Sequence, residues 1–432
     1  AGLPKAVGAD AAVDESAVRP PFEGLRVVDL TAFWAGPFAT GMLAALGADV
    51  VKIESIQRPD GMRYAGAIPG DRLWENSPIF HGCNMSKRAI TLNLDDEEGK
   101  ALLRRLLADA DVVIENFSAR VMENFGFTWD VLHEINPRLI SVRMPAWGLD
   151  GPWTDRTGFA PSVEQAGGLA WITGYPDMPL IPRGVCDPIG GMHTVFALAM
   201  GLEERERTGK GMLVESSLVE PALNIAAEQV IEWTAYGEFL TRDGNRGPVA
   251  SPQAVFEAKP SQTETRYEKK HVALAIASDA QWAALVDFLG RPDWATKAAY
   301  VTEAGRRAEE VVIEDALAEW FATQDCDEVV ERLLAIGIPA ATLVNGYMIS
   351  PNPQLEARGF TRPLEHAVAG TKRYAGLPFQ LSNEAATVYR WAAPTLGAHN
   401  DEVLGGELGL TRAELDALAD KKVIGNWPAF EA

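Results

Sequence analysis

The sequence has little cysteine, no excess of positive charge and no long hydrophobic run, and each deficit excludes a class of protein. Only 3 of 432 residues are cysteine, Cys83, Cys186 and Cys326, and no two form a CxxC pair, which argues against a disulfide scaffold and structural zinc. Acidic residues outnumber basic residues by 60 to 39, so nucleic acid and anionic membranes are poor partners. The longest apolar stretches, such as 195–200, are too short to span a membrane. We therefore expect a globular protein of the cytoplasm.

Several common catalytic motifs are also missing. The chain contains no GxSxG, HExxH, P-loop or EF-hand pattern, so a serine hydrolase of the α/β type and the usual metal or triphosphate enzymes have no support. Glu54 stands where a ribose-binding carboxylate would be expected in a dinucleotide enzyme, but the preceding turn, FWAGPFATG, lacks GxGxxG. Binding of NAD or FAD is therefore disfavoured.

The first half of the chain alternates strand-like segments with amphipathic helices. LRVVDL (25–30) is β-branched, and after Pro37 the apolar residues recur at helical spacing until Gly47. Further strands are predicted over the ranges 48–54, 111–117 and 139–148. Between the first two of these lies a helix, over 97–110, whose leucines share one face. This alternation predicts an α/β fold with a Rossmann-like parallel sheet, whose ligands bind at the carboxyl ends of the strands.

Two Gly- and Pro-rich breaks suggest the domain organisation. TRDGNRGPVASP (241–252) and SPNPQ (350–354) enclose a segment of different texture, with strand-like runs and helices typical of a smaller α+β domain. The first residues are small and polar without an apolar core, and they are predicted to form a flexible tail and not a signal peptide. The predicted organisation is a tail over 1–21, a large domain over 22–240, a small α+β domain over 241–350 and a return to the large domain over 351–432.

The segment RGVCDPIGGMHTVFALAMGLEERERTGKG (183–211) is the most informative. Asp187 before Pro188 is typical of a helix N-cap, with a helix running to about Arg205. The alternative is functional: a carboxylate at the positive end of a helix can act as a nucleophile, and Gly190 and Gly191 would leave room for substrate. The sequence leaves both interpretations open.

Aromatic and thiol groups near these segments also have two interpretations. Phe33 and Trp34, in the loop after the first strand, could stack on an adenine or a pantetheine arm, or could close the end of the sheet. Cys186 could be a thiolate nucleophile, but no histidine or asparagine partner can be assigned to it, so a buried thiol is favoured.

Several long segments in a fixed order resemble the family III CoA-transferases, which include formyl-CoA transferase, carnitine CoA-transferase and α-methylacyl-CoA racemase. The similar segments are VVDLTAFWAGPFATGMLAALGADVVKIE, NMSKRAITLNLDDEEGKALL, ADVVIENFSARVMENFGFTWDVLHEINPRLISV, GVCDPIGGMHTVFALAMGLEERERTGKGMLVESSL and HNDEVLGGELGL. The resemblance implies an interlocked dimer, in which each chain forms a large Rossmann-like domain from both termini and a small central domain.

The resemblance also implies the site residues. Asp187 takes the position of the family's catalytic aspartate, which forms an acyl anhydride and then an aspartyl-CoA thioester. Coenzyme A, bound as a substrate and without a metal, is expected to contact Phe33, Trp34, Ala35, Lys87, Arg88, Leu92, Asn116, Phe117 and Arg120.

The chain departs from the family at a few positions. Ser55 and Asn124 replace basic residues of some members, which leaves Arg58 or Arg120 as the alternative phosphate contact. The segment TGFAPSVEQAGG (157–168) has no histidine, so racemisation is disfavoured. No glycine run like the one that covers the active site in formyl-CoA transferase occurs around 241–252.

The resulting hypothesis is a CoA-transferase that moves CoA from an acyl-CoA to a carboxylic acid. The sequence leaves two alternatives. One is an acyl-CoA hydrolase on the same scaffold, in which water takes the acyl group. The other is a non-catalytic acyl-CoA binding protein, in which Asp187 only caps a helix.

Overall fold

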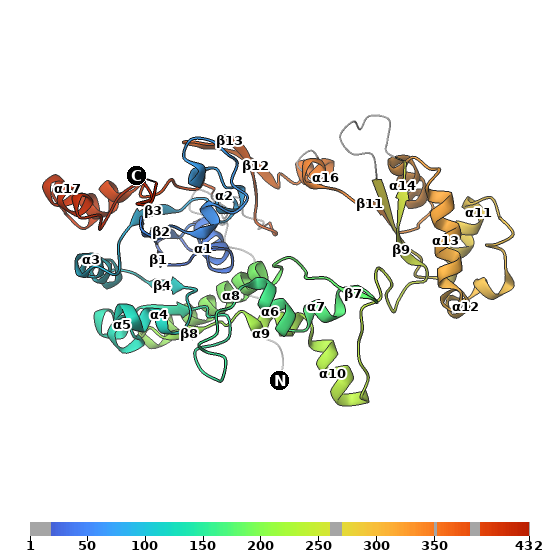
Figure 1. Cartoon of the computed structure of the whole chain (residues 1–432), viewed down its shortest axis with the longest axis horizontal. Coiled ribbons are helices and arrows are strands. Elements are labelled where there is room, and N and C mark those ends of the chain that lie inside the picture. Colours follow the sequence, from blue (N-terminus) through green and yellow to red (C-terminus); the bar gives the residue numbers. More distant parts are fainter. Residues whose placement is uncertain (1–18, 260–269, 350–351, 381–388, 432) are drawn as a thin grey trace, which may run out of the picture. The chain divides into compact units, whose positions relative to one another are not determined.

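A computed structural model describes residues 19–259, 270–349, 352–380 and 389–431, which form two compact units (Figure 1). Unit 1 comprises the residues up to Ala170, Ile181–Glu238 and the residues from Gln354 onward; unit 2 comprises Trp171–Leu180 and Phe239–Pro353. The short segment Trp171–Leu180 thus belongs with unit 2, which its position in the chain did not indicate. Residues 1–18 of the predicted tail and 350–351 of the second break lie outside the described residues.

Unit 1 is built on a parallel sheet of six strands in the order β3-β2-β1-β4-β5-β8, as expected for an α/β fold. The strands are β1 (Arg26–Asp29), β2 (Asp49–Glu54), β3 (Arg88–Thr91), β4 (Val112–Glu115), β5 (Ile140–Arg143) and β8 (Leu213–Glu215). Val28 in the middle of β1 lies opposite Val51 of β2 and Val113 of β4, and all three are buried. The predicted parallel sheet is confirmed, although β3 and β8 were not predicted as strands.

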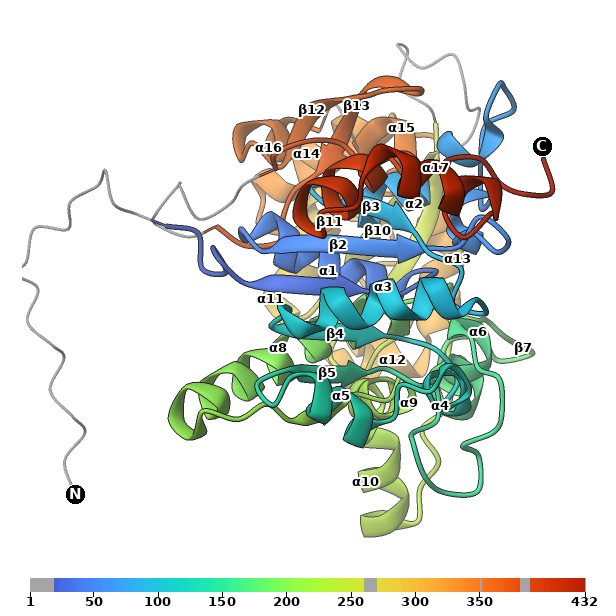
Figure 2. The ribbon, with the colours of Figure 1, turned by 90° about the vertical axis from the view of Figure 1, so that its left-hand side faces the viewer.

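Helices cover both faces of this sheet, as Figure 2 shows. The helices of unit 1 are α1 (Ala35–Ala45), α2 (Pro78–Cys83), α3 (Glu97–Ala108), α4 (Arg120–Phe125), α5 (Trp129–Ile135), α6 (Ala160–Ala166), α8 (Cys186–Thr208), α9 (Val219–Ile225), α10 (Ala227–Tyr236), α16 (Pro353–Ala357) and α17 (Arg412–Asp420), with the π-helix η6 (Asp401–Glu407). Helices α3, α5 and α17 pack on one face, and α1, α6, α8 and α9 on the other. The leucines predicted to share a face of α3 are buried in the first of these cores.

The C-terminal part of unit 1 covers the edge of the sheet. An edge strand leaves backbone N–H groups that need partners. On β3, the N–H of Ala89 donates to Nδ1 of His399 at 3.0 Å, and the N–H of Thr91 donates to Oδ1 of Asn400 at 2.9 Å. The hairpin β12 (Thr361–His366) and β13 (Gly370–Ala375) belongs to the same part. The C-terminal part of the chain therefore satisfies the backbone groups of β3 at the edge of the sheet.

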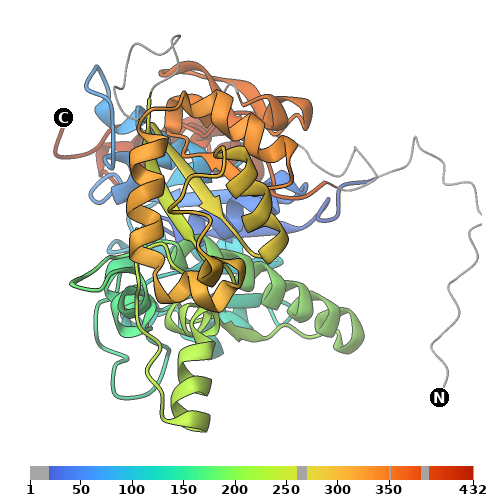
Figure 3. The ribbon, with the colours of Figure 1, turned by 90° about the vertical axis from the view of Figure 1, so that its right-hand side faces the viewer.

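Unit 2 is an α+β arrangement, seen from its own side in Figure 3. Its antiparallel sheet has the order β11-β10-β9, and helices pack on that sheet around a separate core. The elements are β9 (Gln253–Ala258), β10 (Lys270–Ala275), β11 (Ala340–Thr342), α11 (Asp279–Phe288), α12 (Glu303–Ala308), α13 (Glu310–Phe321), α14 (Cys326–Ala335) and α15 (Gly346–Ile349), with α7 (Leu169–Ile172), β6 (Gly174–Tyr175) and β7 (Met178–Pro179) at the Trp171–Leu180 segment. Among the helices of the described residues, none has the length and apolar character needed to cross a bilayer.

Two glycines near the start of α8 allow close contact with neighbouring elements. A Cβ on Gly191 would lie 2.8 Å from the carbonyl oxygen of Ala35 on α1, and a Cβ on Gly190 would lie 2.7 Å from Leu218. Both glycines are buried. The expectation that they leave room for substrate is therefore wrong, because protein atoms fill that space.

Replacing Gly191 with alanine is expected to lower the free energy of unfolding by about 1–3 kcal/mol, since overpacking forces α1 and α8 apart. Denaturant unfolding measures the change. Gly82→Ala is the matched control, because Gly82 is a helical glycine at which an added Cβ would meet no atom within 4 Å, and its stability should stay equal or rise slightly. Equal losses in both variants would contradict the close packing.

Candidate active site

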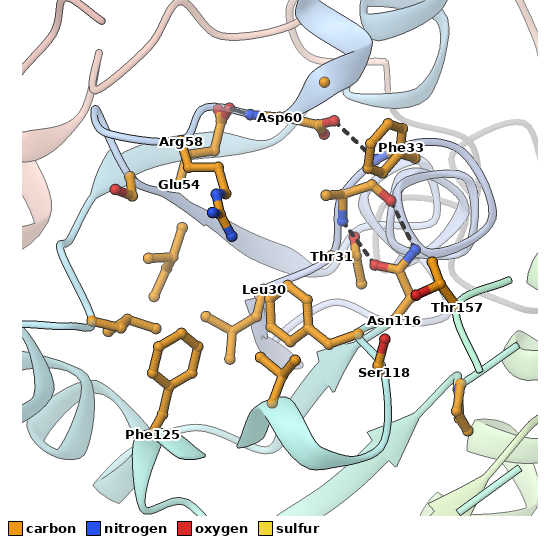
Figure 4. A pocket seen from close by; sticks show the side chains of 18 of the residues that line it. Leu30, Thr31, Phe33, Glu54, Arg58, Asp60, Asn116, Ser118, Phe125 and Thr157 are labelled. Atoms are coloured by element: carbon orange, nitrogen blue, oxygen red, sulfur yellow. Dashed lines mark hydrogen bonds between the residues drawn. The ribbon is translucent and has the colours of Figure 1, made fainter. Parts of the chain in front are cut away.

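A cavity of about 670 Å³ lies at the carboxyl ends of the parallel strands of unit 1 (Figure 4). Its walls are the loops that follow β1, β2, β3, β4 and β5. The loops after β1 and β4 flank the point where the strand order reverses, which is where open α/β sheets bind ligands. The volume falls in the range of roughly 300–1,000 Å³ that is usual for small-molecule sites.

Two arginines supply positive charge to this cavity. Arg58 follows β2 and extends into the cavity in Figure 4. Arg156 lies on the loop before α6, with its guanidinium 4.5 Å from the centre of the Trp153 ring. Neither arginine forms an ion pair with a carboxylate in the described part of the chain. Both guanidinium groups therefore remain available to an anionic ligand.

The acids on the β2 side of the cavity are already paired. The Glu54 carboxylate forms an ion pair with the Arg63 guanidinium at 2.7 Å, and the Asp60 carboxylate forms one with the Lys52 ammonium at 3.0 Å. Both cations are fully buried. Burial alone would raise the pKa of Glu54, but the Arg63 charge outweighs it and holds this pKa below its ordinary value. Glu54 therefore stabilises the fold and does not bind a ribose. Because Glu54 and Asp60 are paired with other cations, they do not neutralise Arg58 and Arg156.

The loop after β1 is held in a strained conformation. Phe33 has φ +64°, a region that bulky residues rarely adopt and that costs about 1–3 kcal/mol. Asp60 accepts a hydrogen bond from the N–H of Phe33 at 2.8 Å. Asn116, at the end of β4, both accepts from the N–H and donates to the carbonyl of Ala32, each at 2.8 Å (Figure 4). Side chains that follow β2 and β4, the strands on either side of β1, therefore fix the position of this loop and of Phe33 at the cavity wall.

Asp187 lies in the first turn of α8, two residues later than an N-cap. The helix begins at Cys186 and its N-cap is Val185, which makes no side-chain hydrogen bond. The expected capping role of Asp187 is therefore wrong. Its carboxylate is half-buried and makes no hydrogen bond or ion pair with the residues that the structure describes. A half-buried carboxylate without a hydrogen-bond partner is unusual, and it indicates a role other than stabilising the fold.

Glu164 of α6 takes over the capping of α8. Its Oε1 accepts a hydrogen bond from the N–H of Cys186 at 3.3 Å, and the whole residue is buried. Burial raises the pKa of Asp187 to about 7, and the charge of Glu164 acts in the same direction. Asp187 therefore changes its charge near neutral pH.

The start of α8 lies near aromatic residues of the cavity wall. The rings of Phe33 and Phe159, which both line the cavity, contact each other edge to face at 5.2 Å. The residues that follow them, Trp34 and Ala160, face Gly184: a Cβ there would lie 3.0 Å from the Trp34 ring and 3.6 Å from Ala160. Asp187 itself does not line the cavity, but its helix starts beside the aromatic residues Phe33, Trp34 and Phe159.

The structure separates the residues expected to contact CoA into three groups. The first group lines the cavity and comprises Phe33, Leu92, Asn116 and Phe117. Trp34 and Ala35 form the second group and lie at the start of α1, against the first turns of α8. The third group, Lys87, Arg88 and Arg120, does not line the cavity.

The basic residues of the third group have partners of their own. The Lys87 ammonium is fully buried, where it pairs with Asp29 at 3.0 Å and donates to two oxygens on α1 and to one at the C-cap of α2. Arg88 pairs with acids that include Asp49 and Glu402. Arg120 is exposed and lies 3.8 Å from Asp155. Arg156, which the sequence pattern did not indicate, lines the cavity instead, and its position on an irregular loop gave no periodic signal to reveal it.

Cys186 is not placed to act as a nucleophile. Its side chain is fully buried, and burial, followed by the charges of Asp187 and Glu164, raises the pKa of its thiol. A thiol held in its neutral form is unreactive. Within the described ranges, no group of three or more His, Cys, Asp or Glu side chains is positioned to hold a metal ion.

Asp187→Asn is expected to stabilise the fold at pH 8, by roughly 1–3 kcal/mol once partial solvent exposure is allowed for. The folded state raises the pKa of this group from 3.8 to about 7, so an ionised Asp187 costs the folded state free energy above pH 7. The advantage of the variant should shrink as the pH falls from 7 and vanish below about pH 4, where both states are protonated. Denaturant unfolding at pH 4, 6 and 8 measures the difference in free energy of unfolding between the variant and the wild type. A difference that does not change with pH would contradict the raised pKa of Asp187.

Comparison with known proteins places the chain among enzymes that use CoA. The family model described as CoA-transferase family III matches residues 22–400. The chain is 30% identical over 415 residues to the succinyl-CoA–D-citramalate CoA-transferase of Chloroflexus aurantiacus, which covers 95% of this chain and 100% of that relative. It is 31% identical over 417 residues to the formyl-CoA:oxalate CoA-transferase of Streptomyces avermitilis, with 93% and 99% covered.

The fold is similar to that of a CaiB/BaiF family protein from Brucella suis, a solved structure with a TM-score of 0.80 and 30% identity that covers 92% of this chain and all of that chain. The match of sequence model, relatives and fold over almost the whole length confirms the resemblance seen in the sequence. The chain belongs to CoA-transferase family III and is an enzyme of the CoA-transferase class.

Proposed function

We propose that this enzyme transfers CoA from an acyl-CoA donor to a carboxylic acid, with Asp187 as the nucleophile. The observation that carries the proposal is a half-buried carboxylate at the start of α8 that no described residue binds, with a pKa raised to about 7 by burial and by Glu164. A carboxylate with a raised pKa is a stronger nucleophile than an ordinary carboxylate, and with a pKa of about 7 roughly half of the Asp187 groups are ionised at neutral pH. The cavity beside its helix supplies the space for CoA.

Each step exchanges one acyl bond for another of similar energy. The Asp187 carboxylate attacks the thioester carbonyl of the donor, which forms an acyl-aspartyl anhydride and releases CoA thiolate. The thiolate then attacks the aspartyl carbonyl, forms an aspartyl-CoA thioester and releases the donor acid. The acceptor carboxylate attacks this thioester, which gives a new anhydride and releases CoA thiolate again. The thiolate then attacks the acceptor carbonyl of that anhydride, which forms the new acyl-CoA and frees the Asp187 carboxylate. The acyl energy is kept only if water stays away from these intermediates.

Coenzyme A fits the chemistry of the cavity wall. Leu92, Phe117 and Phe125 offer apolar contacts to an adenine or a pantetheine arm. We assign the phosphate contacts to Arg58 and Arg156, because both line the cavity and neither has a carboxylate partner in the described part of the chain. Lys87 and Arg88 would then act through the fold. Lys87 pairs with Asp29 at the carboxyl end of β1, which carries a lining loop, and Arg88 joins the amino ends of β3 and β2 through Asp49.

We also propose a homodimer, interlocked as the family resemblance implies. Helix α10 buries none of its residues, and Val230, Ile231, Trp233 and Tyr236 on it are each more than half exposed. A monomer in water rarely leaves several large apolar side chains of one helix uncovered. A second copy of the chain is the occupant we propose, and sedimentation of the purified enzyme measures the oligomeric state.

The compartment we propose is the cytoplasm. All three cysteines of the chain are buried and unpaired. Unpaired cysteines suit a reducing environment. Localisation of the tagged chain in its own cell tests this point.

The test of the function is transfer measured against hydrolysis. The enzyme, an acyl-CoA and an acid from a panel are mixed, and the products are separated to give the new acyl-CoA and free CoA. Dicarboxylic acids belong first in the panel, since the names of the relatives specify citramalate and oxalate. A transferase forms the new acyl-CoA only when acceptor acid is present and releases little free CoA. Free CoA released at the same rate without any acid would instead identify a hydrolase.

A further inference from the structure

One carboxylate oxygen of Glu164 makes a structural hydrogen bond, and the other makes none with the described residues. Its Oε1 caps α8 through the N–H of Cys186, one residue before Asp187. Its Oε2 is buried and has no hydrogen-bond partner in the described part of the chain. A capping role alone requires one oxygen and would be filled equally well by a neutral amide. The buried second oxygen is a cost that the cap does not explain.

No cation of the described residues pairs with this charge at the start of α8. Among the described residues, neither Glu164 nor Asp187 belongs to an ion pair. Helix α1, which packs closely on α8, carries no titratable residue, and α2 presents the buried thiol of Cys83. On α9, Glu220 is exposed. The Glu164 carboxylate is therefore the charged group that faces Asp187 from the surrounding elements.

We propose that Glu164 is a positioning residue that sets the pH at which Asp187 becomes a nucleophile. This inference rests on the proposed function of Asp187. The two carboxyl groups stand at one helix end, and a like charge in a poorly solvated place opposes ionisation of its neighbour. Through the N–H of Cys186, Glu164 also fixes the backbone that carries Asp187. A single side chain thus controls both the place and the basicity of the nucleophile.

The consequence for the reaction is a balance between two properties. A more basic carboxylate attacks a thioester faster, but it is ionised in a smaller fraction of the enzyme at low pH. With Glu164 present, activity should fall below about pH 7, where Asp187 takes up a proton. Without the Glu164 charge, the loss should occur at lower pH.

The test is the pH profile of kcat/KM for Glu164→Gln. Glutamine retains an oxygen for the Cys186 N–H but removes the charge. We expect the acid limb to move by about one pH unit to lower pH, so that the variant is more active than the wild type, relative to its own plateau, below pH 6. Glu220→Gln is the matched control: it removes one exposed carboxylate from the neighbouring α9 and should leave the profile unchanged. Circular dichroism checks that each variant is folded.

A readout that does not depend on activity follows the proton directly. With ¹³C-labelled aspartate, infrared spectra of the wild type should contain a protonated carboxyl band that is absent from Asp187→Asn, and its midpoint should shift to lower pH in Glu164→Gln. An acid limb and a band midpoint that stay in place would overturn the inference and leave Glu164 as a helix cap only. If Asp187→Ala retains turnover, the proposed function itself fails. The turnover of this variant therefore tests the function, whereas the pH profile and the band midpoint of Glu164→Gln test the inference.

Discussion

Asp187→Ala is expected to reduce the transfer rate by at least about a thousandfold, because removing a covalent nucleophile eliminates every step of the proposed route. The side chain has no partner in the described part of the fold, so its loss should not disturb α8. Affinity for CoA, measured by calorimetry, should remain within a few-fold of the wild type, because Asp187 does not line the cavity. Steady-state transfer assays measure the rate.

Two controls make this result specific. Asp130→Ala removes an exposed aspartate from the first turn of another helix, α5, and should leave transfer unchanged. Incubation with acyl-CoA followed by hydroxylamine should give a hydroxamate on the peptide that contains Asp187 in the wild type and none in the variant. Normal turnover by Asp187→Ala, or a modified peptide elsewhere in the chain, would refute the covalent mechanism.

The sequence pattern was informative about the sheet wherever the chain is buried on both faces. Segments such as VVDL and DVVIE contain consecutive β-branched apolar residues, and β1 and β4 lie where these segments predicted. Strand β3 (RAIT) was missed because it lacks the consecutive β-branched apolar residues that mark β1 and β4, and it begins with a charged residue, Arg88. Its charge is compatible with a strand only because Asp49 and Glu402 pair with it, and Glu402 comes from a segment more than 300 residues away.

The site was less predictable than the fold, because tertiary partners decide the role of each polar side chain. Asp187 followed by Pro188 is typical of an N-cap, yet α8 starts earlier and Glu164 supplies the cap. Lys87 was expected at the ligand, but Asp29 and the first turns of α1 enclose its ammonium. Arg156 stands in an irregular loop without a local pattern, so that only the folded cavity reveals it.

Replacing both Arg58 and Arg156 with methionine is expected to weaken CoA binding by roughly 100-fold or more, with each single variant weakening it about 10-fold. A charge-assisted hydrogen bond to phosphate contributes about 1.5–3 kcal/mol, and about 1.4 kcal/mol corresponds to a tenfold change in Kd. The expected effect follows from the position of the two guanidinium groups at the cavity, without carboxylate partners among the described residues. Calorimetry with CoA measures it.

Pantetheine separates the loss of phosphate contacts from a general disturbance of the cavity. It has the arm of CoA but lacks the nucleotide phosphates, so its weak binding should change little in the double variant. Arg120→Met is the matched control, since Arg120 lies near Asp155 and outside the cavity lining. Higher salt should weaken CoA binding to the wild type more than to the double variant, because salt screens exposed charges. Equal losses for CoA and pantetheine would show that the arginines shape the cavity and do not contact phosphate, and a large loss in Arg120→Met would return the phosphate contact to that residue.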